Sequence, residues 1–138
     1  MSINIIVYLD EKNDKLKMTN RNLDVEKNKT GIQNQRITWW LFGKLGNGAF
    51  LPTTGPLPGF EWDDPAAAKP FFKIIGVDHD GRSLSIDDTN KPGAKEQQWS
   101  YLLRVFYDGK FYESVFSKKR PLKIRKKLLA DHPIIINR

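Results

Sequence analysis

Large apolar side chains occupy every second position in one stretch of the chain. They are Trp99, Tyr101, Leu103, Val105 and Tyr107. A period of two places alternate side chains on opposite faces of a β-strand. Asp108-Gly109 follows, and this dipeptide supplies the two positive φ angles that a type I′ turn requires. The pattern therefore predicts a β-hairpin in which Lys110–Ser117 runs back along the preceding strand.

The same alternation predicts two further firm strands, Ile3–Asp10 and Arg36–Phe42. The two faces of the second strand carry Ile37, Trp39 and Leu41 on one side and Thr38, Trp40 and Phe42 on the other. Shorter strands are expected at Lys15–Met18, Asn22–Glu26, Ala49–Leu51, Phe60–Trp62, Phe71–Asp78, Ser83–Asp87 and Ile134–Ile136. The first two of these are expected to be exposed, as an irregular hairpin or a flap. Pro121–Ala130 fits a helix or a strand equally well.

Short strands separated by turn signals, with little helix, indicate an all-β fold. We expect a single domain over residues 1–138, built as an antiparallel two-sheet sandwich of about seven to nine strands. The Gly- and Pro-rich stretch Gly43–Gly59 is longer than most connections, so it is either a functional loop or a crossover between the sheets.

A tryptophan-bearing strand at Trp39-Trp40, followed late in the chain by the Trp99–Tyr107 alternation and a glycine turn, resembles immunoglobulin-like β-sandwiches. The chain lacks the cysteines of antibody domains. In its length and in Asp64-Pro65 it also resembles small uncharacterised bacterial proteins of the DP-EP family, although it contains no Glu-Pro pair. Both resemblances imply a fold and no activity.

The positive charge of the chain lies at one end. Residues 118–138 hold eight basic residues and one acidic residue, whereas residues 1–117 hold fifteen of each, so the whole net charge of +7 belongs to the C-terminal segment. This segment ends in the apolar strand Ile134–Ile136, after a charge-neutral body. Seven of its cations are candidate phosphate ligands in nucleic-acid binding: Lys118, Lys119, Arg120, Lys123, Arg125, Lys126 and Lys127.

The sequence contains few residues in patterns that are typical of catalytic sites. Without cysteine there is no thiol catalysis and no cysteine-ligated zinc, and neither His79 nor His132 lies in a nucleophile or metal motif. Asp78-His79-Asp80-Gly81 contains possible metal ligands, but it is more typical of a hairpin turn. We therefore expect no enzymatic activity, no cofactor and no metal. The N-terminus has neither a signal-peptide pattern nor a membrane-spanning one, and a cytoplasmic location without a membrane partner is expected.

Three classes of binding function remain. The leading hypothesis is a protein that acts through protein–protein contacts and forms a homo-oligomer, because the terminal apolar strand Ile134, Ile135 and Ile136 could add to the sheet of a neighbour. Nucleic-acid binding is the first alternative. Carbohydrate binding through Trp39, Trp40 or Trp62 is the least supported. We favour a loop that covers both adjacent tryptophans; otherwise one indole is exposed for a ligand or for a subunit interface.

Overall fold

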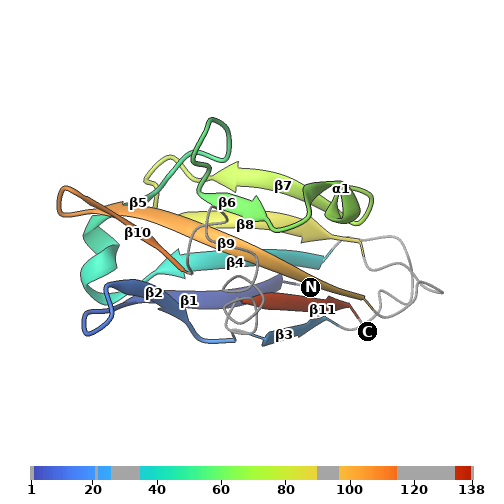
Figure 1. Ribbon diagram of the computed structural model, residues 1–138, viewed down its shortest axis with the longest axis horizontal. Coiled ribbons are helices and arrows are strands. Elements are labelled where there is room, and N and C mark those ends of the chain that lie inside the picture. Colours follow the sequence, from blue (N-terminus) through green and yellow to red (C-terminus); the bar gives the residue numbers. More distant parts are fainter. Residues whose placement is uncertain (1, 21, 26–34, 90–96, 115–132, 138) are drawn as a thin grey trace, which may run out of the picture.

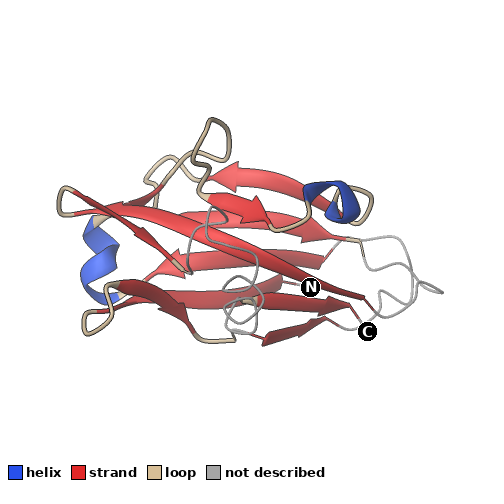
Figure 2. Cartoon of the chain, in the orientation of Figure 1, coloured by secondary structure: helices blue, strands red, loops and turns tan. Residues whose placement is uncertain are grey.

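The computed structural model describes residues 2–20, 22–25, 35–89, 97–114 and 133–137. Strands dominate these residues, and helix is limited to the 3-10 turn η1 (Gly43–Asn47) and the short helix α1 (Pro65–Ala68) (Figure 2). The strands are β1 (Ser2–Asp10), β2 (Lys15–Met18), β3 (Asn22–Val25), β4 (Gln35–Leu41), β5 (Ala49–Phe50), β6 (Phe60–Trp62), β7 (Phe72–Val77), β8 (Ser83–Asp88), β9 (Gln97–Tyr107), β10 (Lys110–Glu113) and β11 (Ile134–Asn137). The all-β prediction is confirmed, with eleven described strands where about nine were expected at most.

Two sheets face each other (Figure 1). The first sheet has the order β2-β1-β4-β8-β7. The second has the order β10-β9-β11-β3, and β5 and β6 also pair with the long strand β9. Most strand pairs are antiparallel as expected, but both sheets are mixed, because β1 pairs with β4 in parallel and β3 pairs with β11 in parallel. Parallel neighbours need a long crossover, and residues 11–34 between β1 and β4 provide one.

The hydrophobic core lies between the inner faces of the two sheets. Trp39 of the first sheet contacts Tyr101 of the second, with 5.2 Å between their ring centroids. The Trp39 indole N–H donates a 3.1 Å hydrogen bond to the Tyr101 hydroxyl, which in turn donates to the sulfur of Met18 at 3.1 Å. All three side chains are buried, so the Trp39 indole N–H and the Tyr101 hydroxyl both have hydrogen-bond partners inside the core. Burial raises the pKa of Tyr101 well above its ordinary value.

The predicted hairpin is confirmed. Asp108 and Gly109 have φ angles of 50° and 74°, as a type I′ turn requires, and β10 pairs with the end of β9. The interpretation of Gly43–Gly59 as a crossover between the sheets is also confirmed. The chain leaves the first sheet after β4 and continues as β5, which pairs with β9 of the second sheet.

The two early short strands form where they were expected, but their predicted arrangement as an exposed hairpin or flap is wrong. β2 pairs with β1 in the first sheet and β3 pairs with β11 in the second, so the two do not form a hairpin. Leu16 and Leu23 are buried rather than exposed, because each contributes to the core from a different sheet. The ambiguous stretch 121–130 lies outside the described residues.

Candidate binding face

The two adjacent tryptophans of β4 lie on opposite faces of the first sheet. Trp39 points inward and is fully buried, whereas Trp40 points outward and keeps 42% of its surface exposed. The favoured interpretation, in which the loop 43–59 covers both indoles, is therefore wrong: that loop crosses to the second sheet and leaves Trp40 accessible. Strand alternation places the two indoles on opposite faces of the sheet, and the second sheet covers only the face that carries Trp39.

The outward side chains of the first sheet form two halves, which follow from the strand register. In the polar half, Arg36 lies beside Asp87 and forms a two-pronged ion pair with it at 2.9 and 3.2 Å. The next pair along the strands joins the hydroxyls of Thr38 and Ser85 at 2.8 Å. These polar groups satisfy one another, so this half offers few unsatisfied groups to a ligand.

The other half of the same face is aromatic. Tyr8 and Phe42 keep 40% and 63% of their surfaces exposed, and Ile6 of β1 lies beside Trp40 in the parallel register. The Trp40 indole N–H donates to the Asn4 side-chain oxygen at 2.9 Å, which fixes the orientation of the ring. Large apolar side chains gathered on an outer sheet face indicate a contact surface.

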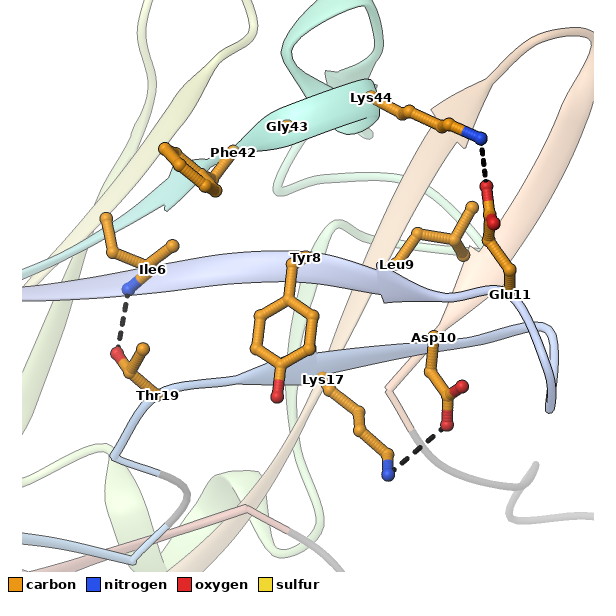
Figure 3. A pocket seen from close by; sticks show the side chains of 10 residues that line it. All are labelled: Ile6, Tyr8, Leu9, Asp10, Glu11, Lys17, Thr19, Phe42, Gly43 and Lys44. Carbon is orange, nitrogen blue, oxygen red and sulfur yellow. Dashed lines mark hydrogen bonds and ion pairs between the residues drawn. The ribbon is translucent and has the colours of Figure 1, made fainter.

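An open groove of about 690 Å³ lies over this aromatic half. Ile6, Tyr8, Leu9 and Phe42 supply its apolar side chains, and Figure 3 shows them along β1 and at the end of β4. We call this site the outer groove. Its rim carries two cations and two anions in ion pairs, Lys17 with Asp10 at 3.2 Å and Lys44 with Glu11 (Figure 3).

The ion pairs of the rim leave the outer groove without a net charge. The amide of Asn13 donates to the Asp10 carboxylate and lowers its pKa, and Lys17 contributes in the same direction. A hydrogen bond to Glu11 raises the pKa of Lys44. Both shifts favour the charged forms of Asp10 and Lys44. An apolar floor inside a balanced rim suits a neutral or apolar partner better than a polyanion.

The other predicted interaction residues lie elsewhere. Trp62 joins Trp39 in the core, and only 6% of its surface is exposed. Ile134 to Ile136 belong to β11, which is paired on one edge with β9 and on the other with β3 of the same chain. Ile135 and Ile136 are buried. This strand therefore has no open edge for a neighbour, which removes the reason for placing it in an interaction surface.

The seven basic residues proposed for nucleic-acid binding, Lys118 to Lys127, lie outside the described residues, so that function stays a prediction. The aspartate-rich turn behaves as predicted: the Asp78 carboxylate accepts hydrogen bonds from the backbone N–H groups of Arg82 and Ser83 at 3.0 and 3.4 Å. Across the described ranges no cluster of three potential metal ligands occurs, and no helix there is long and apolar enough to cross a membrane.

Sequence reasoning missed Tyr8 and Phe42 as members of a site. The signal was present, because period-two alternation places Tyr8 on the side of β1 opposite to Ile5 and Val7, which are fully buried. Which outward aromatics adjoin one another depends on the parallel pairing of β1 with β4, and the sequence does not reveal that pairing.

Comparison with protein-family models finds no match for this chain, and a search of curated proteins finds none. The resemblances to immunoglobulin-like domains and to the DP-EP family therefore stay predictions. The face of the first sheet is the feature from which a function can be argued.

Proposed function

We propose that the protein is a non-enzymatic domain that acts through protein–protein contacts and associates with further copies of itself through the outer groove. The observation that carries the proposal is the group of three exposed aromatic side chains, Tyr8, Trp40 and Phe42, on the outer face of the first sheet. They lie beside the polar pairs Arg36–Asp87 and Thr38–Ser85. Aromatic side chains are enriched at protein interfaces and supply much of the binding free energy there.

Preorganisation supports a contact at this face. The aromatic side chains stand on β1 and β4, two neighbouring strands of a five-stranded sheet, and Asn4 holds the Trp40 indole in place. Burying Trp40 in a contact therefore costs little side-chain entropy, because its orientation is already restricted. Burial of exposed apolar area then contributes about 25 cal/mol per Å².

The mass of the particle as a function of concentration tests the proposal. Sedimentation velocity of the wild type should show association that Phe42→Thr abolishes, since Phe42 is the most exposed aromatic of the groove. Leu57→Thr is the matched control, because Leu57 is 55% exposed on a loop away from the groove and should leave the association unchanged. A wild type that stays a single chain at every concentration contradicts the proposal.

Salt separates self-association from nucleic-acid binding. Copies with a net charge of +7 repel one another, so added salt should strengthen their association. Binding of nucleic acid through residues 118–127 should weaken as salt rises, because each phosphate contact releases counterions. Fluorescence anisotropy of labelled DNA and RNA across a salt series measures this weakening. The control is the variant in which Lys123, Arg125, Lys126 and Lys127 are replaced by glutamine, which should not bind.

Carbohydrate binding is a second candidate at the same face, favoured by the exposed and fixed indole of Trp40. An aromatic ring held in place can stack on the C–H face of a sugar, and neutral sugars suit a rim without net charge. A glycan array should then give signals that Trp40→Ala abolishes. An array that stays blank with the intact protein excludes this candidate.

A further inference from the structure

Two strands of the second sheet, β10 and β11, pair with successive stretches of β9. The first pairs with residues 104–107 of β9, and the second pairs with residues 97–100. Both pairs are antiparallel, so β10 and β11 run in the same direction (Figure 1). The connection between them, residues 115–132, lies outside the described residues. Its two ends, however, are fixed by described hydrogen bonds.

These hydrogen bonds place β10 and β11 on the same edge of β9. The N–H of Ser114 donates to the carbonyl of Leu103 at 3.0 Å, and the N–H of Tyr101 donates to the carbonyl of Pro133 at 3.1 Å. Alternate residues of a strand direct their backbone groups to the same edge, so Tyr101 and Leu103 share one edge. The backbone groups of Arg104 point to the other edge, where they bond to residues next to β5 and β6. The strands β10 and β11 therefore follow each other along β9.

A single position of β9 separates the two strands. Ser114 continues the register of β10 opposite Leu103, and Pro133 precedes the register of β11 opposite Tyr101. Only Leu102 lies between these two positions, so one residue would be enough to join β10 and β11 into one strand. The chain has eighteen residues there instead. We call residues 115–132 the insertion.

The insertion carries almost all of the net charge of the chain. It holds seven basic residues and one acidic residue, which is +6 of the total of +7. The rest of the chain, residues 1–114 and 133–138, keeps a net charge of +1. A large net charge of one sign keeps copies of a protein apart, and salt screens this repulsion. The charge that opposes association thus belongs to a segment that the strand pairing does not require.

We propose that the fold does not need the insertion and that its positive charge restrains self-association. The inference rests on the proposed function, since it assigns a control on association through the outer groove. Both strands next to the insertion already have partners, β10 in β9 and β11 in β9 and β3. The outer groove belongs to the first sheet, whereas the insertion leaves from the second, so excision keeps every residue of the groove.

Excision of the insertion tests both parts of the inference. One threonine replaces residues 115–132 and joins Ser114 to Pro133, because a β-branched residue before a proline favours an extended backbone. The melting temperature should stay within about 5 °C of the wild type, since no described strand pair is lost. Sedimentation velocity at low salt should show tighter association, on the order of tenfold, with a weaker dependence on salt.

A second variant separates the charge of the insertion from its bulk. It keeps the full length of the chain and replaces the seven basic residues with glutamine. They are Lys118, Lys119, Arg120, Lys123, Arg125, Lys126 and Lys127. This variant should associate as tightly as the excised one, because both lack the positive charge.

The outcomes distinguish the inference from the proposed function. A melting temperature that falls by more than about 5 °C on excision overturns the inference. It would show that the insertion contributes to folding, for example by covering Leu102, which alternation places on the outer face and which is only 3% exposed.

The association measurements decide the second part. A stable excised variant that associates no more tightly than the wild type overturns the restraint by charge, and so does a glutamine variant that behaves like the wild type. Both results leave the proposed function intact, provided that Phe42→Thr still abolishes association. If the wild type and the excised variant are single chains at every concentration and salt, the proposed function is contradicted together with the restraint.

Discussion

Trp39 and Trp40 are consecutive residues with opposite surroundings. Trp39 is fully buried between the sheets, and its indole N–H donates to Tyr101, the centre of the core. Trp40 is 42% exposed on the outer face, and its N–H donates to Asn4. The same side chain thus serves packing at one position and is available for binding at the next. What separates the two roles is the strand alternation together with a cover on only one face of the sheet.

Alanine substitution should show the largest difference in stability between Trp39 and Trp40. Trp39→Ala should lower the free energy of unfolding by about 3–5 kcal/mol, because it leaves a large cavity in the core. Trp40→Ala should lower it by about 1 kcal/mol, because its indole is already partly in water. Urea unfolding of both variants measures the difference. Equal losses would show that the outer indole is as important to stability as the inner one.

Removing one hydroxyl from the core should have the next largest effect. Tyr101→Phe deprives the Trp39 indole N–H of its buried acceptor and should cost about 1–3 kcal/mol of unfolding free energy. Tyr8→Phe, on the exposed face, is the matched control and should change stability by no more than about 0.5 kcal/mol. Thermal or urea unfolding reports both values, and a neutral Tyr101→Phe would contradict the importance of the hydrogen bond.

The ionisation of the inner tyrosine provides a test by pH. Burial raises the pKa of Tyr101 above the ordinary value of 10.0, so the folded state binds its proton more tightly than the unfolded chain does. The stability that follows from this shift is complete below pH 10.0 and is lost as the pH rises further. An absorbance titration of tyrosinate in the folded protein should therefore count the same number of groups in the wild type and in Tyr101→Phe. One group fewer in the variant would show that Tyr101 ionises freely.

The smallest expected effect concerns the support of the outer indole. Asn4→Ala removes the acceptor of the Trp40 N–H, which can then bond to water, so stability should fall by only about 0.5 kcal/mol. Association should weaken, because the indole is no longer held in one orientation. Sedimentation at several concentrations, beside unfolding of the same variant, separates the two effects. A large loss of stability with unchanged association would contradict the assignment of Asn4 as a support for the binding face.

The sequence predicts local features of this molecule well. Alternation identifies β1, β4 and β9, and Asp108-Gly109 identifies the type I′ hairpin, because both depend on neighbouring residues. The sequence also assigns Trp39 and Trp40 to opposite faces of one strand. It does not say which face the second sheet covers, because that is decided by packing between distant segments.

Long-range pairing explains the errors. The apolar composition of Ile134–Asn137 is compatible with an edge strand that pairs with another copy, yet this strand lies between β3 and β9 of its own chain. The parallel pairs β1–β4 and β3–β11 join segments far apart in the chain, and alternation carries no information about strand partners. The outer groove could not be predicted for the same reason, since Tyr8 and Phe42 become neighbours only through the β1–β4 pairing.

Trp40 lies beside Ile6, which lines the outer groove. The accessibility of Trp40 as a function of protein concentration therefore tests most directly whether this face is a contact between copies. The other three tryptophans are at least 94% buried, so the quenching lost in Trp40→Phe measures the exposure of Trp40 alone. We predict that a neutral quencher reaches Trp40 in dilute protein and reaches it progressively less as the concentration rises and copies associate. Quenching that stays constant while the particle mass grows would place the contact elsewhere and contradict this account.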